Sequence, residues 1–471
     1  MNRPARAIQR LDVTTAIVNE LVARRYETLS DASVKIARQC VLDWLGVTMA
    51  AADEPLVRIL AADSSEQGGA PHASVVRGGR NTIYDAALVN GAAGHALDYD
   101  DVAFAMSAHA SAAILPALMA LAQFRKANGR AVLTAFIAGY EAGCRIGTLV
   151  APGHYDAGFH GTATIGTFAA AAACSHLLGL DAEHVAQAIG IAATQAAGIQ
   201  CMFGTMCKPL HAGKAAQNGL RAAVLAAKGF ESRPDALECA QGFASTHSAD
   251  FSPEFALAEP EGGYFLYKTL FKYHASCYMT HSVIENVLKL RPGIFFDPHA
   301  LKSMTVTINP KIDTVCNIAA PQTGLEVKFS LRHCAALTLA GIDTSRLETF
   351  SDRMAADPRL VMMREKIAVE FNEQQPKTFS EVVVDMESGE RLTASHDSDV
   401  PDKDLARQMS RLVQKFRSLS ESRIGIAAAN RVIELVVSLH DQPSVEPLLE
   451  LCLGAPTQTV KSQPNSIKRR M

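Results

Sequence analysis

The sequence predicts a mainly α protein in which a smaller α+β segment interrupts a large helical part. In residues 12–272, apolar side chains recur every three or four positions, the period of a helix that buries one face. From about residue 275, β-branched segments with strand-like alternation appear, and from residue 403 the helical pattern returns. We therefore expect a helical part at 1–275, an α+β part at 276–402, a returning helical part at 403–455 and a disordered tail at 456–471.

The helical segments are rich in alanine and glycine. Examples are AAILPALMALAQFRKA (112–127) and AVLTAFIAGYEAGCRIGTLV (131–150). Small side chains let helix backbones approach closely, and no sustained heptad pattern is present. These segments favour a compact bundle of buried helices over a coiled coil.

Four strands are expected in the α+β part. SMTVTINP (303–310) and KIAVEFNE (366–373) each read as one strand. TFSEVVVDMESGERLTASHDS (378–398) reads as a hairpin that turns at residues 387–389. Helical segments such as LRHCAALTLAG (331–341) lie between them.

Composition excludes several classes of protein. Hydrophobic residues make up 48% of the 471 residues, enough for a large core, and the net charge of −3 argues against nucleic acid as the main partner. The ten cysteines form no C-x-x-C pair, which is typical of a reducing compartment. No secretory signal or membrane-spanning run is evident, so a soluble, cytoplasmic protein is expected.

One short segment, GHALDYDDVAFAMSAHAS (94–111), concentrates groups that can bind metals or transfer protons. It holds two histidines and three aspartates: His95, His109, Asp98, Asp100 and Asp101. Such side chains could ligate zinc or iron, yet no H-E-x-x-H motif or EF-hand loop is present. Aspartates at a break between helices could instead cap the next helix.

Four basic residues occur in one repeated context, at or just before a predicted helix start: His109, His160, Lys208 and His281. Helix N-termini carry free N–H groups and partial positive charge, so they attract carboxylates and help keep a nearby histidine neutral. Convergence of these termini would create a pocket in which lysine binds a carboxylate and histidines move protons. Each residue alone could be an ordinary loop residue. No nucleotide-binding loop or G-x-S-x-G motif is present.

Four motifs, taken together and in order, resemble the MmgE/PrpD family over most of residues 10–450. They are NGAAGHALDYDDV, GFHGTATIGTFAAAAA, GTMCKPLHAGKAAQNGL and KYHASCYMTHSVIE. The family includes 2-methylcitrate dehydratase, cis-aconitate decarboxylase and iminodisuccinate epimerase. The resemblance implies a large all-helical domain built from both chain ends, a smaller α+β lid domain, a homodimer, and chemistry without a metal or organic cofactor.

The resemblance also implies a set of acid–base residues. His160 is expected to be the general base and His109 the proton donor, with Asp98 orienting His109. For binding, Lys208 and Lys272 are expected to hold substrate carboxylates and His281 to assist. Asp98 and Lys272 enter through the resemblance alone.

Some positions depart from the cis-aconitate decarboxylase pattern. Val102 replaces a threonine, the gap between Asp98 and His109 is one residue longer, and TVCNIAAP (314–321) lacks an expected tyrosine. HYDAGFHGTATIG and GTMCKPLH are more similar to the iminodisuccinate epimerase branch.

The sequence thus predicts a cofactor-independent lyase, of dehydratase or decarboxylase type, acting on a small di- or tricarboxylate. The alternatives are an epimerase that uses the same site and a non-catalytic polycarboxylate-binding protein. The segment from about 275 to 400 is expected to select the substrate.

Overall fold

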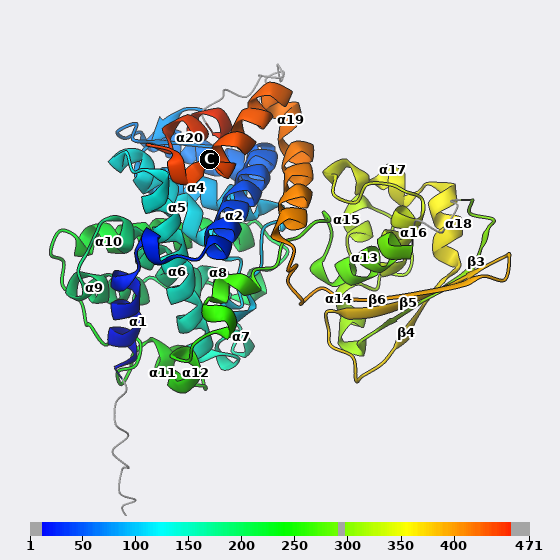
Figure 1. Ribbon diagram of the computed structural model, residues 1–471, viewed down its shortest axis with the longest axis horizontal. Coiled ribbons are helices and arrows are strands. Elements are labelled where there is room, and N and C mark those ends of the chain that lie inside the picture. Colours follow the sequence, from blue (N-terminus) through cyan, green and yellow to red (C-terminus); the bar gives the residue numbers. More distant parts are fainter. Residues whose placement is uncertain (1–11, 291–296, 454–471) are drawn as a thin grey trace, which may run out of the picture.

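The computed structural model describes residues 12–290 and 297–453. The chain forms two lobes, which we call the helical lobe and the small lobe (Figure 1). The small lobe contains the helices and strands between His281 and Asp397, and the helical lobe contains those before and after them. The predicted disordered tail at 456–471 lies outside the described residues.

The helical lobe contains segments from both ends of the chain. Its α-helices are α1 (Val13–Ala23), α2 (Asp31–Ala50), α3 (Pro55–Gln67), α4 (Ile83–Ala96), α5 (Ala110–Arg125), α6 (Gly129–Val150), α7 (Gly153–Asp156), α8 (Gly161–Leu177), α9 (Ala182–Ala193), α10 (Cys207–Ala226), α11 (Phe243–His247), α12 (Pro253–Ala256), α19 (Leu405–Val437) and α20 (Glu446–Cys452). A two-stranded ribbon, β1 (Ala73–Ser74) and β2 (Arg80–Asn81), lies between α3 and α4. None of the helices in the described part is long and apolar enough to cross a membrane.

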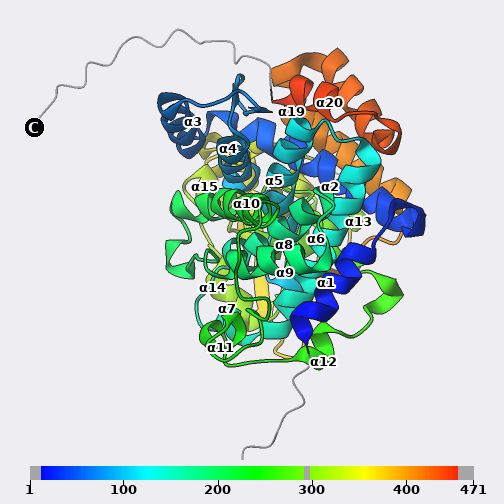
Figure 2. The ribbon, with the colours of Figure 1, turned by 90° about the vertical axis from the view of Figure 1, so that its left-hand side faces the viewer.

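Small side chains bring the central helices together. Helices α5, α6, α8 and α10 lie side by side in the middle of the lobe, and α4 packs on α10 (Figure 2). A Cβ atom added at Gly91 of α4 would lie 2.8 Å from the Cα atom of Gly213 in α10. Real Cβ atoms do not approach a backbone atom so closely, so glycine is required where these helices cross. The expectation of a compact helical bundle is confirmed.

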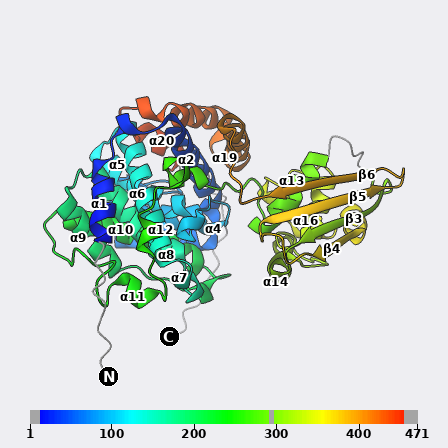
Figure 3. The ribbon, with the colours of Figure 1, turned by 60° about the horizontal axis from the view of Figure 1, so that its bottom comes forward.

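The small lobe packs short helices on one four-stranded sheet (Figure 3). The strand order is β4-β3-β5-β6, in which β3 pairs parallel with β4 and antiparallel with β5. Its elements are α13 (His281–Leu290), β3 (Leu301–Ile308), α14 (Asp313–Cys316), α15 (Gly324–Val327), α16 (Leu331–Leu339), α17 (Asp352–Ala355), α18 (Pro358–Glu365), β4 (Ile367–Phe371), β5 (Phe379–Met386) and β6 (Arg391–Asp397). All four predicted strands, including the hairpin, are confirmed.

Helix α19 returns the chain to the helical lobe, where it packs along α2 (Figure 1). A left-handed residue, Gly425 (φ +78°), kinks this helix. The predicted boundaries at 276 and 402 fall between elements, and they stay a prediction.

A buried ion pair fastens α19 to α2. The Lys415 ammonium lies 2.6 Å from Asp43, and both side chains are at most 2% exposed. Lys415 also donates a hydrogen bond to the carbonyl oxygen of Tyr99 and lies 3.9 Å from the ring centroid of Tyr99. This lysine therefore joins three segments that are far apart in sequence.

Removing the Lys415 ammonium should destabilise the protein strongly, because an uncompensated carboxylate would remain buried. We expect Lys415→Met to lower the free energy of unfolding by about 3–5 kcal/mol, measured by urea titration. Asp43→Asn combined with Lys415→Met should recover part of this loss. In the exposed pair Arg431–Glu434, Arg431→Ala should cost less than about 1 kcal/mol. Equal stability of Lys415→Met and the wild type would contradict this role.

Candidate active site

The loop after α4 carries the carboxylate on which the site centres. Asp98 adopts a left-handed backbone conformation (φ +50°), which few non-glycine residues do. Four residues after Asp98, two backbone hydrogen bonds between Val102 and Leu270 attach the loop to the 269–273 segment.

Asp101 accepts hydrogen bonds from the backbone N–H and hydroxyl of Ser111, in the first turn of α5. Asp101 therefore binds a free N–H group in the first turn of α5, whose N-cap residue is His109. Asp100, for which capping was also expected, contacts His95 and His109 instead.

Two ammonium groups share the Asp98 carboxylate. Lys208, at the start of α10, lies 2.7 Å from Asp98 Oδ1, and Lys272 lies 3.0 Å from Oδ2. Partial desolvation by itself would raise the pKa of Asp98, but the Lys272 and Lys208 ammonium groups hold it well below its usual value. The Asp98 side chain is 45% exposed, whereas Lys208 is 21% and Lys272 3% exposed. The accessible part of the cluster is therefore a carboxylate backed by two positive charges.

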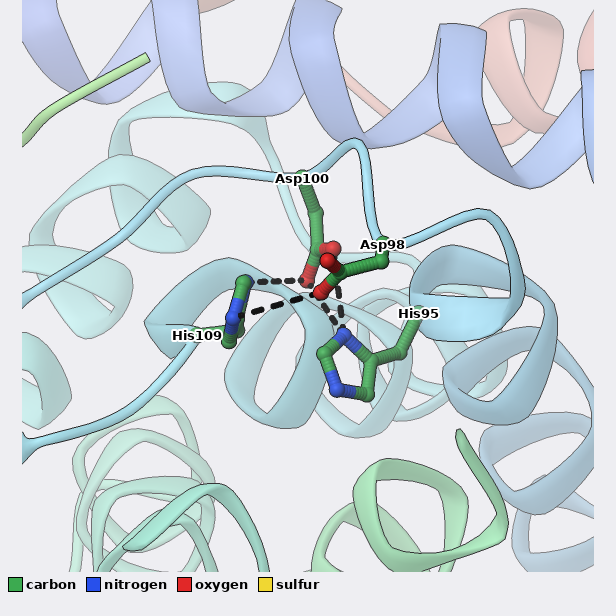
Figure 4. A group of neighbouring side chains, drawn as sticks. All are labelled: His95, Asp98, Asp100 and His109. Carbon is green, nitrogen blue, oxygen red and sulfur yellow. Dashed lines mark hydrogen bonds and ion pairs between the residues drawn. The ribbon is translucent and has the colours of Figure 1, made fainter. Parts of the chain in front are cut away.

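A second carboxylate, Asp100, organises two histidines behind Asp98 (Figure 4). His95 Nδ1 donates to both Asp100 oxygens, at 3.1 and 3.0 Å, and His109 Nδ1 lies 3.3 Å from Asp100 Oδ2. The opposite nitrogen of His109, Nε2, lies 3.7 Å from Asp98 Oδ1. The two ring nitrogens of His109 thus face two carboxylates, Asp100 at Nδ1 and Asp98 at Nε2, an environment that favours the protonated imidazole.

His95, Asp98, Asp100 and His109 could also be considered as metal ligands, since one ligand atom from each lies within 4.8 Å of the others. The charge around them argues against a cation. Two ammonium groups already bind Asp98, and they would repel a metal ion at that carboxylate. The geometry therefore fits an acid–base cluster better than a metal centre.

His160 lies next to His95. It precedes α8 directly, and its Nδ1 is 3.0 Å from Nδ1 of His211, so one ring donates and the other accepts. Its ring lies 5.9 Å from that of His95 and contacts Phe203 edge-on. Burial lowers the pKa of His160 to about 2, and nearby positive groups including Lys208 act in the same direction. The imidazole is therefore neutral near pH 7.

The sixth predicted residue, His281, lies apart from the Asp98 cluster. Its Nε2 contacts the carbonyl oxygen of His274, and its ring packs against His274 and Tyr278. It lines a cavity of about 740 Å³ between the lobes, together with residues such as Glu285 and Arg411. Asp98, His109, Lys208 and Lys272 thus contact one another and His160 lies beside them, whereas His281 makes no hydrogen bond or ion pair with these five in the described part of the chain.

The predicted helix positions are confirmed. His109 and His160 are the N-cap residues of α5 and α8, Lys208 is the second residue of α10, and His281 is the first of α13. The sequence did not assign active-site positions to Asp100, His95 or His211. Asp100 and His95 lie in the 94–111 segment, whose many histidines and aspartates indicate a site. His211 lies one turn inside a helix, a position that does not by itself indicate a function.

Comparison with known proteins identifies the family to which the chain belongs. The MmgE/PrpD N-terminal domain matches residues 16–256 and the MmgE/PrpD C-terminal domain matches residues 274–441. The chain belongs to the MmgE/PrpD family. The first match covers most of the helical lobe, and the second covers the small lobe and α19. The resemblance carried by the four sequence motifs is therefore confirmed.

Similar members of the MmgE/PrpD family include cis-aconitate decarboxylases. The human enzyme is 27% identical over 398 residues, which cover 80% of this chain and 81% of the relative. The enzyme of Aspergillus terreus is 25% identical over 403 residues, with 79% and 82% covered. The cis-aconitate decarboxylase-like protein oryM of Aspergillus oryzae is 25% identical over 402 residues, with 78% and 82% covered.

The buried site should make stability depend on pH. Burial lowers the pKa of His95 from 6.5 to about 4, so between these values unfolding takes up a proton. The free energy of unfolding should therefore be highest above pH 6.5 and fall as the pH decreases toward 4. His95→Gln should reduce this slope by up to about 1.4 kcal/mol per pH unit.

Urea titrations of wild type and His95→Gln across this pH range would measure the two slopes. The other buried histidines are present in both proteins, so the difference isolates His95. Parallel slopes would show that His95 is not held neutral.

Proposed function

We propose that the protein is a cofactor-independent lyase that acts on a small di- or tricarboxylate by proton transfer next to a carboxylate. The observation that carries this proposal is the cluster of Asp98, Lys208 and Lys272 beside His109. Membership of the family and the cis-aconitate decarboxylase relatives support the same reaction class.

Electrostatics favour an anionic substrate. Two ammonium groups face a single carboxylate at Asp98, so one positive charge is in excess. Lys208 and Lys272 each keep N–H bonds beyond those that Asp98 accepts, and these can bind a substrate carboxylate. A carboxylate held there would have its neighbouring carbon beside the histidines.

Proton transfer then needs a base and an acid. His160 is neutral, so it can remove the proton from the carbon next to the bound carboxylate, and the negative charge of the substrate would raise its proton affinity. The charge that develops on the carboxylate is stabilised by Lys208 and Lys272. When His109 is protonated on both nitrogens, it can deliver the proton on Nε2, while the Asp100 carboxylate near Nδ1 stabilises the imidazolium. In a dehydration, the hydroxyl group on the adjacent carbon takes the proton from His109 and leaves as water. In a decarboxylation no carbon-bound proton is removed: the C–C bond to the departing carboxylate breaks, CO₂ leaves, and the electron pair that remains takes a proton from an imidazolium.

An epimerase is the second candidate. His109 and His160 both flank His95, with ring centroids 4.5 and 5.9 Å from it. One imidazole could remove a proton from one face of a carbon, and the other imidazole could add a proton to the opposite face. A binding protein without turnover would need neither a neutral imidazole nor the Asp100–His109 contact.

Loss of the base or of the carboxylate-binding lysine should abolish most turnover. We expect His160→Ala to lower kcat about 10²–10⁴-fold, the usual contribution of a general base, and Lys208→Ala to lower kcat/KM comparably. Assays would use purified protein with 2-methylcitrate, citrate, cis-aconitate and aspartate-derived dicarboxylates. His184→Ala and Lys214→Ala, at exposed positions of α9 and α10, are matched controls and should stay active. Full activity of both site variants, with unchanged melting temperatures, would refute the assignment.

Incubation in D₂O should separate the two reaction classes. For a lyase, we expect mass spectrometry to detect a product that has lost water or CO₂. An epimerase would instead return substrate that carries one deuterium at the exchanged carbon and is otherwise unchanged in mass. Deuterated substrate without any eliminated product would overturn the lyase proposal in favour of the epimerase.

A further inference from the structure

Tyr99 lies between two residues of the candidate site, but its side chain is buried in the core of the small lobe. Its neighbours in the chain, Asp98 and Asp100, are the two carboxylates around which the site is built. The Tyr99 ring is 0% exposed and belongs to an apolar cluster that consists mainly of small-lobe residues such as Val306 and Val382. The backbone of Tyr99 is therefore part of the site, whereas its side chain packs within the other lobe.

The Tyr99 hydroxyl lies 3.0 Å from each of two backbone carbonyl oxygens, those of Tyr273 and Ser345. A hydroxyl has one hydrogen to donate, so these two carbonyls share it. Ser345 lies in the small-lobe loop between α16 and α17. Tyr273 directly follows Lys272, which pairs with Asp98. One hydrogen atom thus joins the small lobe to the segment that carries a lysine of the site.

The backbone of Tyr99 is fixed to the helical lobe. Its carbonyl oxygen accepts a hydrogen bond from the Lys415 ammonium at 2.6 Å, and the same ammonium lies 3.9 Å from the centroid of the Tyr99 ring. A shift of the Ser345 loop relative to the helical lobe must therefore break its hydrogen bond to Tyr99 or displace Tyr99. A displacement of Tyr99 also displaces Asp98, because a peptide bond joins the two residues.

We propose that Tyr99 is a positioning residue whose hydroxyl makes the placement of the Asp98 carboxylate depend on the small lobe. The inference rests on the proposed function for the role of Asp98. The Tyr99 hydroxyl binds two backbone carbonyls and not a reacting group, so Tyr99 acts through Asp98. Without the bond to Ser345, the Asp98 carboxylate is held less firmly against the two ammonium groups and against Nε2 of His109, which lies 3.7 Å from it.

Amide hydrogen exchange tests this link without a substrate. Tyr99→Phe keeps the ring in the small-lobe core and removes only the hydroxyl. We expect the amides of 97–103 and of 343–349 to exchange about 10-fold faster in this variant, as for the loss of one buried hydrogen bond. Unchanged exchange in these two segments would overturn the inference.

Tyr140→Phe is the matched control for the loss of a buried hydroxyl. The Tyr140 side chain is also buried, and its hydroxyl lies 2.8 Å from that of Thr269, within the helical lobe. This variant should leave exchange at 343–349 at the wild-type rate. Faster exchange there in both variants would show a general loss of stability, and it would contradict a link through Tyr99.

A change made in the small lobe alone gives a second test. Asp343 Oδ1 accepts a hydrogen bond from the backbone N–H of Ser345 at 2.9 Å, so Asp343→Ala should loosen the Ser345 loop. We expect Asp343→Ala to speed exchange at 97–103 about 3-fold or more in the wild-type background and not in the Tyr99→Phe background. No effect in the wild-type background, or an equal effect in both backgrounds, would overturn the inference.

The matched control for Asp343→Ala lies elsewhere in the small lobe. Asp357, the N-cap residue of α18, accepts a hydrogen bond from the backbone N–H of Arg359, also at 2.9 Å. Asp357→Ala therefore removes the same kind of contact from a loop that Tyr99 does not bind. It should leave exchange at 97–103 unchanged, and an effect equal to that of Asp343→Ala would contradict the proposed route.

Turnover separates a positioning role from a merely structural one. For any polycarboxylate that the wild type converts, Tyr99→Phe should lower kcat about 10-fold and change KM less than about 3-fold, since the lysines that bind the substrate are retained. Tyr140→Phe should keep the wild-type kcat at temperatures well below its melting temperature. A wild-type kcat in Tyr99→Phe would refute the positioning role and leave the lyase proposal standing. If the wild type converts no polycarboxylate, the lyase proposal fails, while the exchange measurements still decide whether Tyr99 links the lobes.

Discussion

The meeting of one carboxylate with two ammonium groups at Asp98 is the constraint on which the rest of the site depends. Lys208 comes from the start of α10 and Lys272 from a later segment, and like charges so close together require the negative charge between them. The carboxylate reaches this place because the backbone of Asp98 reverses direction in a left-handed conformation. The surrounding contacts hold this short loop in position.

Much of the architecture is readable from the sequence because it rests on local patterns. Strands such as 301–308 alternate, helices begin after His109 and His160, and proline marks the start of α10 beside Lys208. These features depend on neighbouring residues in the chain, so periodicity and capping rules reach them.

Such rules do not predict which side chains come into contact through the tertiary structure. The contact of Asp100 with His95 and His109 depends on how a loop turns, and the 94–111 segment favoured capping over metal binding for Asp100. The contacts of His281 with His274 and Tyr278 likewise depend on how the chain folds back on itself, which periodicity does not show.

The Lys415 contact also determines when the site can form during synthesis of the chain. Lys415 supports the carbonyl of Tyr99, next to Asp98, across 316 residues of sequence. A growing chain therefore exposes the Asp98 loop long before its support exists, whereas the small lobe is contiguous and can complete its own contacts earlier. The candidate site thus depends on a contact that cannot form until α19 has been made, and a chain released before α19 would carry every predicted catalytic residue without the contact that holds their loop.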